Sequence, residues 1–193
     1  AATLMSMMWA FQAMGIWSEE RGTNMLDTGA HFYDTYECAD GGYVSIGSIE
    51  PQFYAELVRL TGLDEDYAAR GESVPHQMDK VRWEELRTRL AAIFRTRTRD
   101  EWCEVMEGTD VCFAPVLTMS EALEHPHNVE RGTFMEVAGI PQPAPAPRFS
   151  RTPGTVQRPP AHVGQHTDEV LSEWLGADAA RIAELRDGGA VAG

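Results

Sequence analysis

The sequence predicts an α+β fold, in which helices pack beside a small antiparallel sheet. Two runs of aromatic and β-branched residues flank the letters ADGG, which is the pattern of a β-hairpin. Two later runs, over residues 51–61 and 82–95, carry apolar residues at helical spacing. A proline-rich stretch beginning near residue 140 separates this part from short helices close to the C-terminus.

The composition is that of an acidic globular protein. The 193 residues are 43% hydrophobic and 24% charged, and the formal net charge is −14 at pH 7. Such a charge repels nucleic-acid phosphates and anionic membranes, so we expect neither as a partner. The three cysteines, Cys38, Cys103 and Cys112, form an odd number without CxxC spacing, which argues against a disulfide framework and a zinc site. A cytoplasmic location is therefore expected.

The first 17 residues are uncharged and mostly apolar. They lack the basic region and the small-residue cleavage site of a signal peptide. They would make only a marginal membrane span, because Ser6, Gln12 and Gly15 interrupt the apolar run. We expect a helix over residues 1–17 that is buried in protein. Since helices rarely begin uncapped and apolar, we also expect further residues before Ala1.

The hairpin is expected over residues 31–50, followed directly by a helix. The turn pair Asp40–Gly41 suits a tight connection that needs positive φ. Pro51 opens the helix at its first position, where a missing N–H costs little, and Gly62 suits its C-terminal cap. The apolar face of this helix is expected to be Phe53, Leu57 and Leu60.

The middle of the chain is expected to hold a loop, two helices and a strand. Residues 63–80 are predicted as the loop, and a helix follows over residues 82–95. Its apolar stripe is Trp83, Leu86, Leu90 and Phe94. Thr98 has a glutamate three residues later, which is the capping-box spacing, and opens a helix over residues 99–107. The run DVCFAPV, residues 110–116, predicts a short buried strand.

The last third of the chain is expected to be mostly loop and short helices. Ser120 is expected to cap one short helix, and another is expected over residues 126–131. The prolines of residues 141–161 exclude regular structure and predict an extended crossing segment. Thr167 and Asp178 are expected to cap the two final helices.

The letters SIEPQF place a carboxylate between the second hairpin strand and the following helix. Glu50 can be interpreted as a solvated residue that caps this helix, or as a general base. The residue before a proline is held extended, so the direction of its side chain is restricted. Ile46, Ile49 and Phe53 make the neighbourhood apolar, and the helix N-terminus lies beside the carboxylate. These residues alone leave both interpretations open.

Other polar residues favour structural interpretations. His125 and His127 lack a third ligand nearby and fit a turn that starts a helix better than a metal site. Cys112 has apolar neighbours and no adjacent histidine, which favours a buried structural thiol over a nucleophile. Methionines crowd the first 25 residues, where most are expected to pack the helix. Met25 lies in the loop that follows and is the candidate contact for an acyl chain.

Four segments, taken together and in order, resemble one protein family. They are YDTYECADGGYVSIGSIEPQFYAEL, TRDEWCEVMEGTDVCFAPVLTMSEALEHPHNVERGTF, PAPRFSRTPG and PPAHVGQHTDEVL. They resemble the C-terminal half of the family III CoA transferases, and within it they are most similar to the α-methylacyl-CoA racemases. The resemblance covers nearly the whole chain from about residue 3.

The resemblance implies a two-domain fold, with a large α/β domain and a smaller α+β domain, in a homodimer whose subunits interlock. Residues 30–135 would form the small domain. Residues 1–29 would be a helix and linker of the large domain, and residues 136–193 a proline-rich strap with C-terminal helices that return to it.

The resemblance also implies a role for Glu50. Racemases of this family use a His and an Asp of the large domain as one base set, and a Glu at this position as the other base. Family transferases are expected to have a GN-type turn here, which SIEPQF lacks. The implied reaction moves the α-proton of a 2-methylacyl-CoA between the two faces. It needs no metal and no redox cofactor, and CoA is part of the substrate. Met25 and Ile49 are the expected substrate contacts.

The His and Asp positions, and most of the CoA-binding domain, are not in this chain. We therefore expect the isolated chain to be inactive. Two alternatives stay open: a CoA transferase that moves CoA between carboxylic acids, and a non-catalytic dimerisation fragment. The sequence does not choose an acyl chain, because sterol side chains and branched fatty acids fit it equally.

Overall fold

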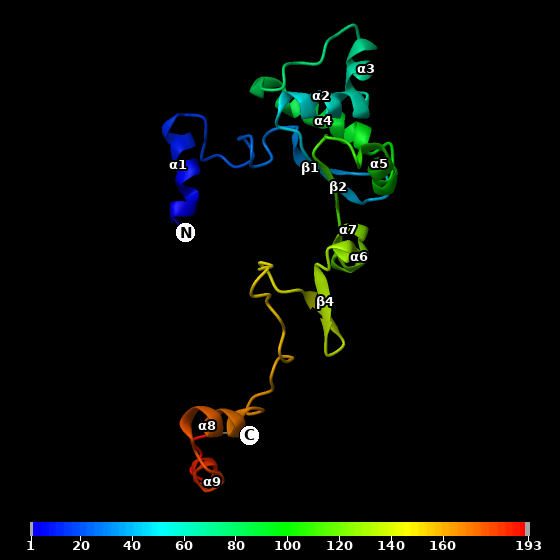
Figure 1. Cartoon of the computed structure of the whole chain (residues 1–193). Helices are drawn as coiled ribbons and strands as arrows, with labels where there is room; N and C mark the ends of the chain where they lie inside the picture. Colours follow the sequence, from blue (N-terminus) through cyan, green and yellow to red (C-terminus); the bar gives the residue numbers. More distant parts are fainter. Residues whose placement is uncertain (1, 192–193) are drawn as a thin grey trace. The chain divides into compact units, whose positions relative to one another are not determined.

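The computed structural model describes residues 2–191, which divide into two compact units. The N-terminal unit ends at Thr118 and the C-terminal unit begins at Met119. Figure 1 shows strands β1 and β2 together with helices α2 to α5, and all of these elements lie in the N-terminal unit. The α+β prediction is confirmed by this mixed content of helices and strands.

The N-terminal segment forms a shorter helix than the sequence predicts. A 3₁₀ turn, η1 (Ala2–Met5), leads into α1 (Ser6–Ala13), and Gly15 then adopts a left-handed conformation that ends the helix. Leu4 is 88% exposed and Trp9 is 66% exposed, so this chain does not supply the expected burial of the helix. Among residues 2–191, no helix combines the length and the apolar character needed to cross a membrane.

The sheet of the N-terminal unit is antiparallel, with the order β1-β2-β3. Its strands are β1 (Tyr33–Glu37), β2 (Tyr43–Gly47) and β3 (Phe113–Val116). The predicted hairpin is confirmed, and Tyr36 pairs with Val44 in its register. In its turn Gly41 has a φ of +79°, and Asp40 Oδ1 accepts a hydrogen bond from the Gly42 N–H. Only the glycine of the predicted pair needs the left-handed conformation.

Four helices pack with this sheet: α2 (Pro51–Thr61), α3 (Leu63–Ala68), α4 (Trp83–Phe94) and α5 (Arg99–Met106). A single 3₁₀ turn, η2 (Lys80–Arg82), precedes α4. The prediction of a loop over residues 63–80 is wrong at its start. Gly62, with a φ of +69°, ends α2 and also precedes α3, whose first turn carries three acidic residues that its N-terminal dipole favours. The capping box of Thr98 is confirmed.

The core lies between the inner face of the sheet and these helices. The predicted stripe of α4 is confirmed, because Trp83, Leu86, Leu90 and Phe94 are all buried. Phe94 stacks on Tyr36 of β1 with ring centroids 5.0 Å apart. The buried side chains of α2 are Tyr54, Leu57 and Thr61, whereas the predicted Phe53 and Leu60 are only half-buried.

The third strand is correctly predicted, but its expected burial is wrong. β3 lies at one edge of the sheet, pairs only with β2 among the described strands, and alternates between half-buried and exposed residues. Cys112, directly before it, is exposed and has a φ of +56°. The apolar run was expected to be covered on both sides, whereas this edge strand is covered on one.

The C-terminal unit is built from short elements. They are α6 (Met119–Glu124), α7 (Pro126–Glu130), the hairpin β4 (Phe134–Val137) and β5 (Ile140–Pro143), α8 (Thr167–Leu175) and α9 (Ala179–Asp187). The first prolines of the proline-rich run lie in β5, contrary to the prediction. They are tolerated because alternate N–H groups of an edge strand face solvent. Positive φ angles at Ala138 and Gly139 make the connecting turn.

The observed helix starts in this unit agree only in part with the starts predicted from the sequence. α6 begins at Met119, so Ser120 lies inside the helix rather than at its cap. α8 begins at Thr167 with His166 in the N-cap position, which shifts the predicted cap by one residue. The cap by Asp178 is confirmed, since its side chain accepts a hydrogen bond from the Arg181 N–H. Among the described residues of this unit, Ile182 is the only buried hydrophobic side chain.

Candidate active-site segment

Glu50 occupies the N-cap position of α2, three residues after the end of β2. Its φ of −70° and ψ of 143° are extended, as expected for a residue before proline. Its backbone carbonyl accepts the first helical hydrogen bond, from Tyr54 N at 2.9 Å. Its side chain makes no capping hydrogen bond and is exposed. The backbone of Glu50 is therefore fixed, while its carboxylate remains available to another molecule.

Residues 47 and 48, which precede Glu50, are anchored to the segments just before β1 and β3. Ser48 is fully buried; its N–H donates to Phe32 O at 3.0 Å, and its hydroxyl donates to the carbonyl of Val111. The N–H of Gly47 donates to Cys112 O at 2.9 Å. The expected apolar neighbour Ile46 points into the core, with 3% exposure, rather than around the carboxylate.

Gln77 supports the same segment from the opposite side. Its Nε2 donates to Ser48 O at 3.0 Å and to Ile49 O at 2.9 Å. The indole N–H of Trp83 in turn donates to the backbone carbonyl of Gln77 at 2.8 Å. The sequence prediction missed Gln77 because it treated residues 63–80 as one loop and saw no pattern that pairs residues 28 positions apart.

The Cys112 thiol lies within electrostatic reach of the Glu50 carboxylate. Burial raises the pKa of the Cys112 thiol, and the negative charges of Glu50 and Asp110 raise it further. A thiol that holds its proton is a poor nucleophile. The predicted buried position is wrong, but this environment fits the prediction that Cys112 is not a nucleophile.

Met25 lines an apolar pocket of about 270 Å³ in the N-terminal unit. Phe11, Ile16, Met78 and Trp83 are among the other lining residues. Neither Glu50 nor Ile49 lines this pocket. Ile49 is half-buried and packs against the core, so the structure does not bring the three predicted site residues into one cavity.

The loop that presents Met25 is held by buried polar groups. Asn24 is 1% exposed, and its N–H and its Nδ2 donate to the two carboxylate oxygens of Asp27, at 2.8 Å and 2.7 Å. The N–H of Gly29 donates to Asn24 O, and a Cβ at position 29 would lie 2.2 Å from that oxygen. Met25 therefore sits on a rigid turn rather than on a free loop.

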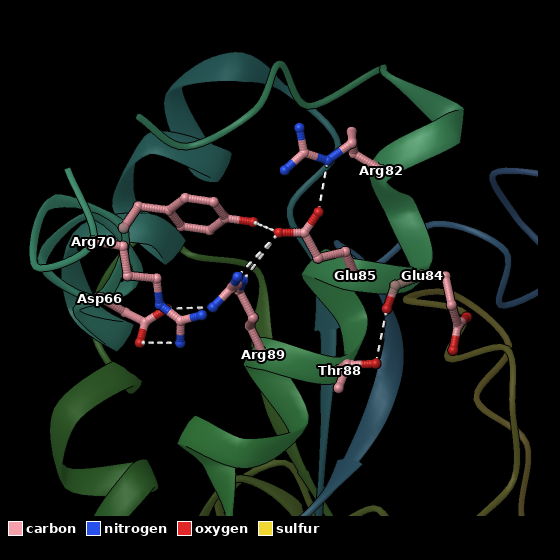
Figure 2. Close-up of polar contacts among 8 residues, drawn as sticks. Asp66, Arg70, Arg82, Glu84, Glu85, Thr88 and Arg89 are labelled. Atoms are coloured by element: carbon pink, nitrogen blue, oxygen red, sulfur yellow. Dashed lines mark hydrogen bonds and ion pairs between the residues drawn. The ribbon is translucent and has the colours of Figure 1, made fainter. Parts of the chain in front are cut away.

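A hollow of about 600 Å³ in the N-terminal unit lies beside a cluster of paired charges on α3 and α4. Figure 2 shows Glu85 between Arg82 and Arg89, with Asp66 facing the guanidinium groups of Arg70 and Arg89. These charges neutralise one another, and the Tyr67 hydroxyl donates a further hydrogen bond to Glu85 at 2.8 Å. The cluster is explained as a structural link between the two helices.

The histidine pair behaves as the sequence predicts. His125 directly precedes α7, and its carbonyl accepts hydrogen bonds from the N–H groups of Asn128 and Val129. This confirms the helix-start interpretation. Across residues 2–191, no three His, Cys, Asp or Glu side chains are grouped as metal ligands would be.

Known proteins are similar to this chain in sequence and in fold. The family model described as CoA-transferase family III matches residues 1–167. The chain is 46% identical to mouse α-methylacyl-CoA racemase over 176 residues and 42% identical to the human one over 177 residues. Each match covers 90% of this chain and 44% of the relative.

A solved structure supports the same fold. A CAIB/BAIF family protein from Brucella suis superposes with a TM-score of 0.60 at 19% identity, covering 89% of this chain and 44% of that one. The chain thus spans under half the length of the curated relatives that it matches. Its sequence and its fold together show that the chain belongs to CoA-transferase family III.

Proposed function

We propose that this chain carries one of the two bases of a racemase that acts on 2-methylacyl-CoA thioesters. The single observation behind this proposal is Glu50, a carboxylate with a fixed backbone and an uncapped, exposed side chain, in a chain 46% identical to mouse α-methylacyl-CoA racemase. A solvated helix cap would be expected to bond the first-turn N–H groups, and Glu50 does not.

In the proposed reaction the Glu50 carboxylate takes the proton from the α-carbon of the thioester. The C–H bond breaks, an O–H bond forms on Glu50, and the electron pair moves into the thioester carbonyl to give an enolate. A second base returns a proton to the opposite face. The resemblance assigns that base to a His and an Asp outside this chain. Hydrogen-bond donors aimed at the enolate oxygen would lower the barrier.

The acyl group is proposed to contact Met25 and Ile49. Met25 lies in the apolar pocket, and a flexible, polarisable thioether adapts to acyl chains of different shape. Ile49 directly precedes the base. The CoA moiety belongs to the substrate, and the proposed proton transfer requires neither a metal nor a redox cofactor.

We further propose that residues 30–135 form the small domain, and that residues 1–29 and 136–193 pack on a large domain in an interlocked homodimer in the cytoplasm. The exposed apolar side chains of α1 and α8 support this, since Trp9 is 66% exposed and Trp174 is 80% exposed. Exposed apolar surface of this kind is typical of an interface.

The test uses the completed protein, which we define as this chain joined to an N-terminal half of the family. Each enantiomer of a 2-methylacyl-CoA is incubated in D₂O, and loss of the α-proton is followed by NMR. The completed protein should exchange both enantiomers. Glu50→Gln should slow exchange of the enantiomer whose proton faces Glu50 by roughly 10²- to 10⁴-fold, which is the range for a lost general base. The isolated chain should show no turnover.

Two other outcomes would replace the proposal. Transfer of CoA to an added carboxylate, without α-proton exchange, would identify a CoA transferase and leave Glu50 as a helix-cap residue. A completed protein whose exchange is unchanged by Glu50→Gln would point to a non-catalytic dimerisation role for this chain.

A further inference from the structure

Gln77 is a buried polar side chain whose contacts all lie next to Glu50. It is 7% exposed, and its Nε2 donates to Ser48 O at 3.0 Å and to Ile49 O at 2.9 Å. Both hydrogens of a primary amide are therefore used on two consecutive backbone carbonyls. No charge is involved, and the contact spans 28 positions of the sequence.

The two carbonyls need this partner because the strand has already ended. β2 stops at Gly47, so residues 48 and 49 are outside the ladder that pairs β2 with its neighbours. Ser48 is fully buried, and a buried carbonyl without a partner is strongly unfavourable. The amide of Gln77 thus acts as the missing neighbouring strand over these two residues.

This contact restrains the backbone from which the Glu50 side chain extends. The carbonyl of Ile49 and the N–H of Glu50 belong to the same planar peptide group, so fixing one fixes the other. On the other side of Glu50, Pro51 restricts the backbone to its extended conformation. The Cα–Cβ bond of Glu50 is consequently held between Gln77 and Pro51.

Gln77 is itself anchored to the core. The indole N–H of Trp83 donates to Gln77 O at 2.8 Å, and the Trp83 ring packs edge-to-face on Phe32 with centroids 5.9 Å apart. Trp83 is 5% exposed. The next residue, Met78, lines the apolar pocket with Met25. A continuous path of packed groups therefore joins the core and the pocket to the segment that carries Glu50.

We propose that Gln77 is a positioning residue that holds the backbone of Glu50, and with it the Cα–Cβ bond from which the carboxylate extends, through the carbonyls of Ser48 and Ile49. This proposal rests on the proposed function, in which Glu50 is the base. Without the amide, the peptide group before Glu50 turns toward water, and the Cα–Cβ bond of Glu50 samples several directions instead of one.

The first test uses the 193-residue chain itself and needs no activity. Gln77→Met removes both hydrogen bonds and keeps the length of the side chain. The NMR order parameter of the Glu50 N–H should fall from about 0.85, typical of rigid backbone, to below about 0.6. The matched control is Thr61→Val, which removes another buried side-chain bond, from Thr61 Oγ1 to Leu57 O at 2.7 Å, at the far end of α2. An unchanged order parameter in Gln77→Met would overturn the proposal.

A second variant, Gln77→Glu, tests the proposal independently if Gln77→Met does not fold. In Gln77→Glu a protonated carboxylic acid can donate one hydrogen bond to the two carbonyls, whereas the ionised form can donate none. The Glu50 order parameter in this variant should rise as pH is lowered. A value that does not change with pH, in a folded protein, would contradict a role for the donated hydrogen bonds.

The third test measures α-proton exchange in the completed protein. Gln77→Met should lower kcat by roughly 10- to 100-fold with KM unchanged, because a misplaced catalytic group impairs the reaction and leaves the substrate contacts intact. Thr61→Val should change neither constant. A rise in KM alone would overturn the positioning role. If the parent completed protein shows no exchange, the proposed function fails, and the order parameters still decide whether Gln77 orders Glu50.

Discussion

Glu50 and Glu85 lie at the N-termini of two helices of the same unit, yet their surroundings are opposite. The side chain of Glu50 makes no hydrogen bond to α2, and the Glu50 segment is supported by neutral backbone groups and the amide of Gln77. Glu85, in the first turn of α4, accepts hydrogen bonds from Arg82, Arg89 and Tyr67. Figure 2 shows how this second carboxylate is surrounded by partners.

The comparison indicates that Glu85 serves stability, whereas Glu50 is free to take part in a reaction. Arg82 and Tyr67 lower the pKa of Glu85 to about 2, so it stays ionised and bound to them at any ordinary pH. A base must exchange a proton with a substrate, and a carboxylate held by several donors does this poorly. Several side-chain donors hold the Glu85 carboxylate, whereas at Glu50 only the backbone is ordered.

The largest expected effect contrasts Glu50→Gln with Glu85→Gln in the completed protein. The first should slow α-proton exchange by roughly 10²- to 10⁴-fold and leave the urea unfolding midpoint nearly unchanged. The second should lower the unfolding midpoint and leave the exchange rate unchanged, because Glu85 links α3 to α4 and touches no part of the Glu50 segment. An equal loss of the α-proton exchange rate in both variants would contradict the different roles of Glu50 and Glu85.

The second prediction concerns His31, a buried group that differs from both carboxylates. Its Nε2 lies 2.9 Å from the Tyr54 hydroxyl of α2, and its Nδ1 has no partner among the described residues. Burial, helped by Arg87, lowers the pKa of His31 to about 3. The unfolded chain, with an ordinary His pKa near 6.5, binds the proton first, so stability should fall as pH drops from 6.5 toward 3.

Because of His31, the free energy of unfolding should fall by about 1.4 kcal/mol per pH unit well below pH 6.5. It is measured from urea midpoints at a series of pH values, in the chain and in His31→Gln. The variant should have a flatter profile between pH 6.5 and 5.5, above the range in which an unfolded glutamate with its ordinary pKa of 4.5 takes up most of its proton. An unchanged slope in this window would mean that His31 is protonated in the folded protein.

The third prediction isolates Glu85 at lower pH. Since the folded pKa of Glu85, about 2, lies below the ordinary glutamate value of 4.5, its contribution to stability is present above pH 4.5 and is lost as pH falls toward 2. Glu85→Gln should therefore narrow the difference in unfolding midpoint between pH 4.5 and pH 2. The measurement is the urea unfolding midpoint of both proteins at the two pH values, and an unchanged difference would contradict this role of Glu85.

The sequence predicts local structure well wherever the cause is local. Thr98 and its capping glutamate, the glycine of the hairpin turn and the stripe of α4 depend on neighbours within a few positions, and all are confirmed. Gly62 shows the limit of such local prediction. A capping glycine predicts the end of a helix, whereas Gly62 ends α2 and also precedes α3.

The candidate site was less predictable because it depends on contacts between distant segments. Glu50 was found from its junction and from the family resemblance, but Gln77 hydrogen-bonds to the preceding residue, Ile49, across 28 positions, and no local pattern marks such a pair. The burial of Cys112 was misjudged for a similar reason: its apolar neighbours suggested an interior strand, whereas the strand lies at the edge of the sheet. Whether Met25 and Ile49 contact substrate stays a prediction.

The smallest expected effect tests whether Glu50 faces the Cys112 thiol. Because the charge of Glu50 contributes to the raised pKa of Cys112, Glu50→Gln should increase its thiolate fraction. Alkylation of Cys112 by iodoacetamide at pH 8 should then be about two- to threefold faster. Cys38 and Cys103 serve as internal standards, since burial raises the pKa of each to about 11.

The control for this measurement is again Glu85→Gln, which removes a negative charge from the paired cluster on α4 and α3 instead. Its Cys112 should react at the rate of the parent chain, as followed by mass spectrometry of the peptide that contains it. An equal acceleration in both variants would show that the thiol senses only the net charge of the protein. Acceleration confined to Glu50→Gln would place that carboxylate beside Cys112.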